Sequence, residues 1–502
     1  MKKYNNLNIK LIMILLISIL LLFITTSSCL SYNKMINETY NKLSEVRKSK
    51  AIKITELFNR VEAKAEALNN DEIMHKFFFF MDNIRNQKIE NNTEAESIVS
   101  EYRKAIDTYY LNKYMDFYDI LFIDNNGEIF YTIRKEGDYK KNIFKNELSK
   151  TKLSKSLSKS PNLMFVDYQY YSPADEPAAF FIVPIMENGV QKGWIVLQYA
   201  INKLNTMMVD YEELGDTGEI YLVNKDHLIL TNSRFKAEDV SLQLKVDTEA
   251  VNSAFISGEG HQLITGYRGV RVFTSFEKLS LWGADWALVA SIEEDEIVTD
   301  YYLKNRTEIA GLLFNILASQ SIPMISRPAQ TDKYSKVDID EYKKAPYDSV
   351  LETRGVSTCT AITVSFPDKF SYLAHISPYD KIYGQVNLTN QLKELIGKIT
   401  YNDIYLRELR NLKIVIVANH VNSIETIIDK LTSYGIRLSQ ITFVYNPTSR
   451  YANVSTTGNG NKTYIDWVYP SKSSTKLVQD ASSVRNLGEV VREIANKIAS
   501  QD

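Results

Sequence analysis

The chain has 502 residues, enough for two to four domains, and a formal net charge of −2. This near balance gives no electrostatic case for nucleic acid as a partner. Two cysteines and five scattered histidines, none at metal-ligand spacing, exclude a disulfide framework and a cysteine-rich zinc site. We therefore expect neither a metal nor another cofactor.

The first predicted element is a membrane segment. Leu11–Ile24 is almost purely apolar, three lysines precede it, and the uncharged residues up to Leu30 extend it to about the twenty positions that a span requires. We predict a signal anchor over residues 1–30, with the N-terminus in the cytoplasm and the following residues outside. The alternatives are a cleaved signal peptide and a lipoprotein-type cleavage at Cys29.

Residues 33–110 are predicted to be helical. Apolar residues recur there at spacings near three and four, and no proline interrupts them. A long stalk helix next to the membrane fits this pattern. A coiled coil fits it equally well, so a homodimer through this helix is an expected partner arrangement.

Strand patterns begin after Asp116. Residues 120–133 form an apolar run, an Asn-Gly turn and a second run, which predicts a hairpin. Residues 180–199 and 220–231 repeat the pattern. We predict two antiparallel sheet modules, here called the first module (residues 111–205) and the second module (residues 206–300).

An ordered set of motifs spans both modules: Asp167-x-x-x-Tyr171-x-Pro173, then Gly215-x-Thr217-Gly218-Glu219-x-Tyr221-Leu222-Val223, then Ser233-Arg234-Phe235. The set resembles the double-Cache family, the extracytoplasmic sensor part of many chemoreceptors, sensor kinases and membrane cyclases. The resemblance covers roughly residues 35–300. It implies two PAS-like modules, the first distal from the membrane and the second proximal, and the detection of a small solute outside the cytoplasm.

Asp167 is the main candidate for ligand binding, because it lies in an aromatic-rich strand. A carboxylate there can pair with the ammonium of an amino acid or another amine, while tyrosine faces add cation–π attraction. Ordinary sheet packing of the tyrosines and a solvated charge run around Arg134 are the alternatives. The further candidates are Phe165, Tyr170, Tyr171, Tyr131 and Arg134.

Residues 301–332 are ambiguous. The apolar stretch 309–325 is short for a membrane span, and Asn315, Gln320 and Pro323 interrupt it, which would be costly in hydrocarbon. A linker and a weak second span both remain open.

Residues 333–502 are predicted to form a separate α/β domain. Strands are expected at 350–364, 372–376, 413–417 and 438–445. Helices are expected at 385–409, 424–434 and 487–499, and a loop at 453–463.

Cys359 and His375 are the candidate catalytic pair of this domain. A turn near Asp368 would place them on adjacent antiparallel strands as diagonal neighbours on one face. A slip of one residue would point them to opposite faces. Imidazole can take the thiol proton, and the resulting thiolate is the attacking species, so we expect a thiol that is partly ionised near neutral pH. A buried structural cysteine is the alternative.

Thr353, Cys359 and His375 also resemble the catalytic residues of the CheD family of chemoreceptor glutamine deamidases. The resemblance covers roughly residues 340–470 and implies a cysteine-dependent deamidase with chemoreceptors or other chemotaxis proteins as partners. It implies that Thr353 orients the substrate amide. The sequence departs from the family at Ser357-Thr358, at Ser371-Tyr372 and at Ala418-Asn419, where glycines are usual.

The expected fold class is therefore α+β: an anchor, a stalk helix, two PAS-like modules and an α/β domain. We expect a cell-membrane sensor of a small solute, used in chemotaxis or other signal transduction and coupled to a CheD-like output domain. A Cys–His protein-glutamine deamidase localised by the sensor, and a tethered binding protein without activity, are the alternatives. Residues 31–300 are expected outside the cytoplasm, and the side that holds the C-terminal domain stays open.

Overall fold

The computed structural model describes residues 2–86, 93–157, 162–208, 212–236, 238–326, 333–377, 406–421, 424–470 and 477–499. Side chains are described from Tyr32 onward, so the predicted anchor at 1–30 lies outside them, as does most of the predicted helix at 385–409. Within the described residues, no helix combines the length and the apolar character that crossing a bilayer requires. The chain divides into two compact units, described separately below: Thr39–Glu293, and Glu294–Asp502 together with Met1–Glu38.

Three helices form the helical stretch expected over residues 33–110: α1 (Lys2–Leu68), α2 (Glu72–Asn86) and α3 (Thr93–Lys113). The break after Leu68 has a local cause in Asp71. Its Oδ1 accepts the backbone N–H groups of Ile73 and Met74 and thereby caps α2. Its Oδ2 accepts hydrogen bonds from Lys113 and Tyr114 at 2.6 and 2.7 Å, which ties α3 to the same point.

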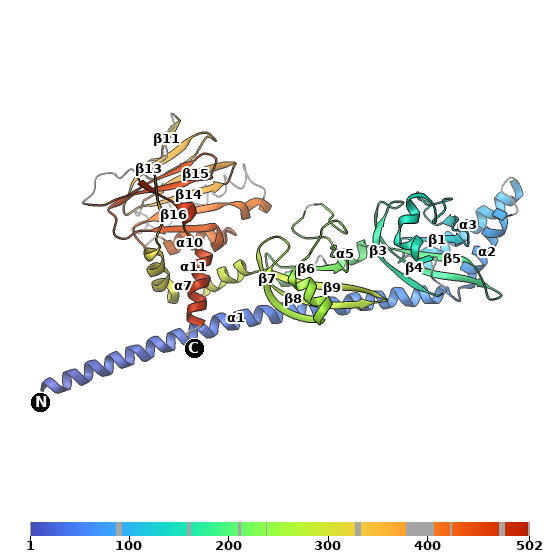
Figure 1. Ribbon diagram of the computed structural model, residues 1–502, viewed down its shortest axis with the longest axis horizontal. Helices are drawn as coiled ribbons and strands as arrows, with labels where there is room; N and C mark the ends of the chain where they lie inside the picture. The colour runs from blue at the N-terminus through green and yellow to red at the C-terminus, as the bar shows by residue number, and fades with distance from the viewer. Residues whose placement is uncertain are drawn as a thin grey trace. The chain divides into compact units, whose positions relative to one another are not determined.

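The first module is a five-stranded antiparallel sheet with strand order β2-β1-β5-β4-β3 (Figure 1). The predicted hairpin at 120–133 is present, since Leu121 pairs with Thr132. The elements are β1 (Asp119–Asp124), β2 (Ile129–Thr132), η2 (Asn146–Lys150), α4 (Lys152–Leu157), β3 (Met164–Tyr171), β4 (Glu176–Glu187) and β5 (Val190–Ala200).

The second module repeats this topology. Its sheet has the order β6-β9-β8-β7, and a bridge between Val223 and Ile229 takes the place that β2 has in the first module. The predicted third hairpin is thus reduced to a strand and a bridge. The elements are α5 (Asn202–Met208), η3 (Glu212–Leu214), β6 (Glu219–Asn224), α6 (Glu249–Ser257), β7 (Glu259–Thr265), β8 (Arg271–Leu281) and β9 (Ala284–Glu293).

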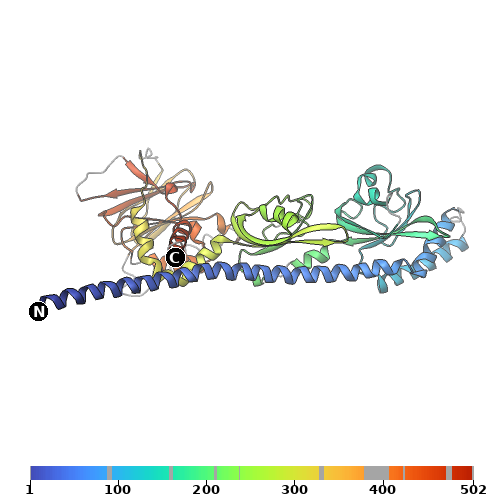
Figure 2. The same cartoon turned by 60° about the horizontal axis from the view of Figure 1, so that its bottom comes forward.

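Each sheet has a helix face and a cover face. On the helix face of the first module, Phe58 of α1 and Phe78 of α2 pack against aromatic rings of the strands. From Thr39 onward α1 runs along both modules (Figures 1 and 2). The cover face is packed by the segment between β2 and β3, where Ile143 and Leu153 contact the sheet. The second module has the same arrangement, with α6 on its cover face.

Arg47 fixes α1 to the second module. Its side chain is only 2% exposed, and Nη1 donates to Ser275 Oγ at 3.0 Å and to the carbonyl of Phe276 at 2.6 Å. Nη2 lies 2.9 Å from Glu259 and 3.6 Å from Glu277. These contacts offset part of the cost of burying the guanidinium, while its Nε has no hydrogen-bond partner among the described residues.

The C-terminal unit contains two sheets. One has the order β10-β20-β19-β18-β13-β11 and the other β12-β15-β14-β16-β17. The strands are β10 (Met324–Ser326), β11 (Tyr334–Lys336), β12 (Glu341–Lys344), β13 (Val350–Val356), β14 (Thr360–Phe366), β15 (Phe370–Ile376), β16 (Lys413–Ala418), β17 (Ile441–Tyr445), β18 (Tyr451–Thr457), β19 (Thr463–Val468) and β20 (Leu477–Asp480). The helices are α7 (Glu294–Ser319), η4 (Leu406–Asn411), α10 (Ile424–Ser433), η5 (Leu438–Gln440), η6 (Ala481–Ser483) and α11 (Leu487–Ala499).

The five-stranded sheet is the middle layer of this unit. Its even-numbered residues in β14 and β15 pack against α7, α10 and α11, and its odd-numbered residues pack against the other sheet. The predicted strands and the terminal helix are present. The loop predicted at 453–463 is partly wrong, because residues 453–457 continue β18, where alternate side chains are buried. Polar composition misled the prediction, since this strand has one half-exposed face.

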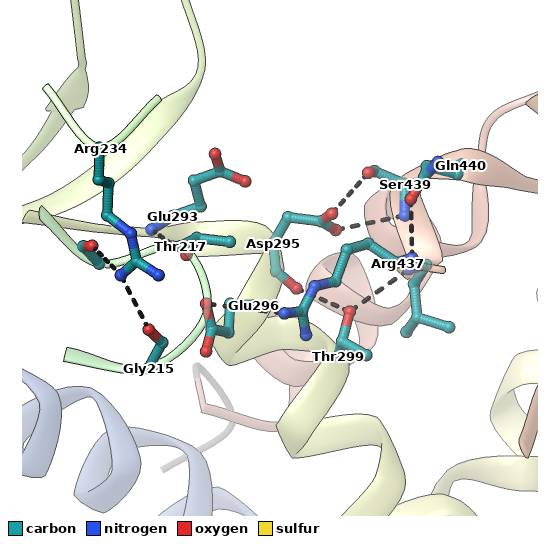
Figure 3. Close-up of polar contacts among 12 residues, drawn as sticks. Gly215, Thr217, Arg234, Glu293, Asp295, Glu296, Thr299, Arg437, Ser439 and Gln440 are labelled. Carbon is teal, nitrogen blue, oxygen red and sulfur yellow. Dashed lines mark hydrogen bonds and ion pairs between the residues drawn. The ribbon is translucent and has the colours of Figure 1, made fainter. Parts of the chain in front are cut away.

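Helix α7 includes part of the ambiguous stretch 309–325. Ile309, Leu313 and Leu317 follow one another at a spacing of four and are buried in the core of the C-terminal unit. Tyr32 of α1 belongs to the same core, with its ring 4.8 Å from that of Tyr301. The first turn of α7 is fixed as well, because the Asp295 carboxylate accepts hydrogen bonds from the backbone N–H and hydroxyl of Ser439 at 3.2 and 2.6 Å (Figure 3).

Replacing Arg47 should destabilise the protein strongly. Arg47→Ala removes the guanidinium that lies 3.6 Å from the half-buried Glu277, so we expect the unfolding free energy to fall by about 3–5 kcal/mol. Chemical denaturation measures this change. Lys53→Ala is the control, since Lys53 is an exposed residue of the same helix and should change stability by less than about 0.5 kcal/mol. Equal effects of the two substitutions would contradict the role assigned to Arg47.

Candidate functional site

A cluster of buried polar groups, here called the recess, lies at one end of the first module's cover face. Asp119 is the first residue of β1, and its side chain points to the same face as Leu121 and Ile123, because side chains alternate along a strand. Gln198 of β5 pairs directly with Asp119 and shares that face with Val196. The recess therefore continues the apolar core into a polar end.

The loop after β2 covers this end with Asp138. Asp119 and Asp138 are each 1% exposed and Gln198 is fully buried. Asp138 Oδ2 accepts the hydroxyl of Tyr171 at 2.7 Å. Asp119 Oδ1 accepts three backbone N–H groups, those of Ile120, Ile133 and Arg134.

Several polar atoms of the recess have no hydrogen-bond partner among the described residues. They are Asp119 Oδ2, Asp138 Oδ1, Glu176 Oε1 and both amide atoms of Gln198. Buried polar atoms are normally satisfied, and each one that is not costs free energy. Four of these atoms are acceptors and one, Gln198 Nε2, is a donor. This excess of acceptors is the expected feature of a site that receives a hydrogen-bond donor.

The charges of the recess are strongly unbalanced. Asp138 interacts with Asp119 and Glu136, and Glu136 interacts with Glu176. The opposing cations are Lys141, which acts on Asp138, and Arg134, which acts on Glu176. Burial raises the pKa of Asp119 to about 7, although the backbone hydrogen bonds to its carboxylate act to lower the pKa. Burial also raises the pKa of Asp138. Both carboxyl groups thus favour a neighbouring cation when they ionise.

The rim of the recess is more exposed. Arg134 stacks on the ring of Tyr118, with its guanidinium carbon 3.8 Å from the ring centroid, and its Nε donates to the carbonyl of Tyr118 at 2.6 Å. The hydroxyl of Tyr118 donates to Glu136 at 2.7 Å. These contacts hold Arg134 over the recess in one orientation.

The structure brings two of the predicted ligand residues, Tyr171 and Arg134, to this recess. Tyr131 and Phe165 lie on the opposite helix face, where Tyr131 packs against Phe77 and donates to Asp107, and Phe165 packs against Phe58. A β-bulge between Val166 and Gln169 separates Phe165 from the cover-face end of β3. Tyr170 is 56% exposed and bonds to Asp175.

Asp167 is engaged elsewhere. Its Oδ1 accepts the indole N–H of Trp286 in β9 at 3.0 Å and the backbone N–H of Tyr168 at 2.8 Å. Burial raises the pKa of this carboxyl group. The structure therefore gives Asp167 a connecting role between β3 and the second module.

Sequence reasoning missed Asp119, Asp138 and Gln198. The Asp119 position carried a usable signal, since a carboxylate directly before an apolar strand is unusual unless it is partnered. Asp138 and Gln198 carried none, because only the pairing of β1 with β5 and the path of the loop bring them together.

The candidate catalytic residues lie between the two sheets of the C-terminal unit. Ala361 pairs with His375, which makes Cys359 and His375 diagonal neighbours on one face, as predicted. Thr353 reaches them from β13 of the facing sheet, and its Oγ1 lies 2.6 Å from Nδ1 of His375. Cys359 is 8% exposed and His375 1%.

The hydrogen bonds of Thr353 determine the tautomer of His375. Thr353 Oγ1 lies 2.8 Å from the carbonyl of Val337, which can only accept, so the hydroxyl proton goes there. Nδ1 of His375 must then carry a proton and donate it to Thr353. Nε2 is left as an acceptor, and it has no partner among the described residues. Burial lowers the pKa of His375, which keeps the ring neutral and able to accept a proton.

Two expectations for this trio change. Burial raises the pKa of the Cys359 thiol, and the charge of Asp340 adds to the effect, so the resting thiol is protonated and not partly ionised near neutral pH. Thr353 contacts the imidazole, which makes it a positioning residue for His375. No group of three or more metal-ligating side chains occurs in the described part of the chain.

A Cache-domain model matches residues 31–301, just over half of the chain. This chain belongs to the Cache-domain family. Its two modules are the two halves of that Cache domain, and the recess around Asp119 lies in the first of them. No curated protein matches the chain.

Three solved structures show how far the similarity extends. The ligand-binding domain of the Pseudomonas aeruginosa amino acid chemoreceptor PctB, in complex with L-Arg, is 12% identical, with a TM-score of 0.34 over 53% of this chain and 97% of that one. The ligand-binding domain of the Pseudomonas fluorescens chemoreceptor CtaA, in complex with L-leucine, is 12% identical, with a TM-score of 0.33 over 53% and 99%. The periplasmic sensory domain of the Campylobacter jejuni chemoreceptor Tlp1 is 13% identical, with a TM-score of 0.37 over 52% and 98%. Similarity at this level carries no conclusion about the ligand of this Cache domain.

The thiol of Cys359 should react slowly at neutral pH. In a Cys29→Ser background we expect iodoacetamide to label Cys359 at least about tenfold more slowly at pH 7 than an exposed cysteine with a pKa near 8.5, because the thiol is buried and protonated. The labelling rate should rise steeply as the pH increases above 7. Mass spectrometry of the labelled peptide measures it.

Thr353→Val tests the tautomer assignment in the same assay. Losing the acceptor of the Nδ1 proton should slow labelling as much as His375→Gln does, while Thr448→Val, at an exposed threonine, should leave the rate unchanged. Fast labelling at pH 7 that is insensitive to both substitutions would contradict the role of His375 as the base.

Proposed function

We propose that this protein is an extracytoplasmic sensor whose first Cache module binds a small amine-bearing solute, such as an amino acid. The observation that carries the proposal is the recess of Asp119, Asp138 and Gln198, where buried acceptor atoms have no hydrogen-bond partner among the described residues. An ammonium group supplies several donors and the positive charge that two buried carboxylates require.

Anionic and metal ligands fit the recess less well. An anion would face four carboxylates and two cations, Lys141 and Arg134, and Arg134 already stacks on Tyr118. A metal ion would need three or more ligands in coordination geometry, and the described residues hold no such group. An amine with a second polar group also uses the rim, where Arg134 can meet a carboxylate.

The proposal places residues 1–30 in the cell membrane as an anchor and the Cache domain outside. The apolar sequence of Leu11–Ile24 and the lysines before it support this orientation. In the same proposal, α1 continues from the anchor into the sensor.

We propose further that the C-terminal domain lies on the same side of the membrane as the sensor. The support is the packing of α7, whose residues Ile309, Leu313 and Leu317 are buried in the core of that domain. Tyr32, which directly follows the predicted anchor, is part of the same core. A helix whose apolar face is used inside a soluble core has no apolar face left for lipid.

A cysteine-dependent amidohydrolase is the second candidate function. It is favoured by the trio of Thr353, His375 and Cys359, in which the histidine tautomer leaves Nε2 able to take a thiol proton. The resemblance to the CheD family rests on the same three residues. A domain outside the cytoplasm could not reach the cytoplasmic glutamines of chemoreceptors. The deamidase therefore requires a cytoplasmic C-terminal domain, whereas the topology proposed above places that domain outside.

A small amine should stabilise the protein in a pH-dependent way. Because the pKa of Asp119 is raised to about 7, the unligated protein should lose stability as pH rises from about 4 to about 7, where the folded state must give up its proton. An amine cation offsets that loss. We therefore expect amino acids or simple amines to raise the melting temperature more at pH 8 than at pH 5.5, with about 2.7 kcal/mol of stabilisation at a hundredfold excess over Kd.

Matched variants distinguish the two candidate carboxylates. Asp119→Asn keeps an oxygen acceptor for the three backbone N–H groups and removes the charge, so it should abolish both the ligand effect and its pH dependence. Asp167→Asn should leave both intact. The opposite pattern would show that Asp167, and not Asp119, binds the ligand.

A topology reporter decides where the C-terminal domain lies. We expect a reporter that is active only outside the cytoplasm to give signal when fused after Asp502, because no part of α7 is available to cross the membrane in this arrangement. A fusion after Gly311, within α7, should behave identically. Cytoplasmic activity of the Asp502 fusion would exclude this topology and support the deamidase.

A further inference from the structure

The second module repeats the polar feature of the first. Glu219 is the first residue of β6, as Asp119 is the first residue of β1, and its side chain shares the cover face with Tyr221 and Val223. Its partner across the sheet is Ser291 of β9, the last strand of its module. Asp119 faces Gln198 in the corresponding last strand of the first module. The two carboxylates therefore occupy equivalent places in the two sheets.

Glu219 is fully buried and only half satisfied. Its Oε2 accepts the hydroxyl of Tyr267 at 2.6 Å. Its Oε1 has no hydrogen-bond partner among the described residues, and no ion pair links this carboxylate to a cation there. A buried carboxylate with one open oxygen is costly unless a donor, preferably a charged one, completes it.

The hydroxyl groups around Glu219 are arranged in one direction. Since Tyr267 gives its proton to the carboxylate, Ser233, at 2.8 Å, must donate to Tyr267. The chain of hydroxyls thus ends on Glu219 and cannot supply a second donor to it. None of the described residues donates to Oε1, so a bound molecule is needed to supply that donor.

The remaining charges of this recess are paired. Arg268 bonds to Glu293 at 2.8 Å and lies 3.7 Å above the ring of Phe235. Arg234 donates to the carbonyls of Gly215 and Gly218, and Thr217 accepts the N–H of Glu293, which fixes the turn that leads into Glu219 (Figure 3). These contacts leave Glu219 as the acceptor that the recess presents.

We propose that the second module holds a second small-molecule site, in which Glu219 accepts a hydrogen bond from the ammonium group of a small primary amine. The ligand is a compact monoamine, because this recess contains one uncompensated carboxylate where the first module has several. The site lies next to Glu293, the residue that directly precedes α7. An amine bound at this site therefore lies close to the end of β9 and can affect it.

Methylammonium is the probe that tests this site, and tetramethylammonium, which has the same charge but no N–H donor, is the control ligand. The experiment uses the full-length protein carrying Asp119→Asn and Asp138→Asn, so that the first module cannot contribute. We expect methylammonium still to raise the melting temperature in this background and tetramethylammonium not to do so. No rise with methylammonium would overturn the proposal, because the open oxygen would then be satisfied by water alone.

Glu219→Gln in that background should weaken methylammonium binding at least about tenfold, as expected for the loss of a charge-assisted hydrogen bond. Its amide oxygen can still accept from Tyr267, which favours correct folding, and circular dichroism checks this. Glu238→Gln removes the same charge from an exposed position of the module and should change nothing. An undiminished response in Glu219→Gln would contradict the site.

Tyr267→Phe provides a second test that does not alter the carboxylate. Among the described residues it removes the one side-chain donor to Glu219, so methylammonium binding should be retained or strengthened, and its loss would overturn the proposal. In a protein whose first module is unaltered, Glu219→Gln should leave the Asp119-dependent response to amines unchanged. The two sites can therefore fail independently.

Discussion

The two-residue period of antiparallel strands is the constraint on which both parts of this protein depend. Once β1 pairs with β5, Asp119 and Gln198 must share the cover face with the apolar core. The same rule places Glu219 in the second module and brings Cys359 and His375 to one face between two sheets. A slip of one residue in any of these pairs would move the polar side chain to the other face.

Burial gives these positions their chemistry. A carboxylate in water has little preference for a partner, but Asp119 is 1% exposed and its pKa rises to about 7 because the charged form loses solvation. The apolar residues on the same face, such as Leu121 and Phe180, keep water away from this carboxylate, so that a cation stabilises its charged form. In the C-terminal domain, the same loss of solvation keeps the Cys359 thiol protonated and the His375 ring neutral. It therefore disfavours the thiolate that nucleophilic attack requires.

The Cache domain is held together by polar contacts that differ in purpose from those of the recesses. Arg47, Asp71 and Asp167 are buried or half-buried groups that connect a helix to a strand, two helices to each other, and one module to the next, respectively. Arg47 and Asp71 meet several partners, and Asp167 has two donors on one oxygen. The recess atoms of Asp119, Asp138 and Glu219 differ in having acceptors without donors. That contrast, and not residue type, separates the proposed binding residues from the structural ones.

The sequence by itself determined the class of the fold and the order of its parts. Alternating apolar residues, the Asn-Gly turn and the Gly-x-Thr-Gly-Glu motif were enough to predict the two sheet modules, and the spacing around Asp368 was enough to place Cys359 beside His375. These are local signals, encoded within about twenty residues. The tertiary structure alone decided which carboxylates were left without partners. Trp286, 119 residues from Asp167, occupies that carboxylate, while the loop carrying Asp138 closes over Asp119. Thr353 likewise reaches His375 from a different sheet. Side-chain satisfaction depends on contacts between distant segments, and no spacing within the chain encodes them.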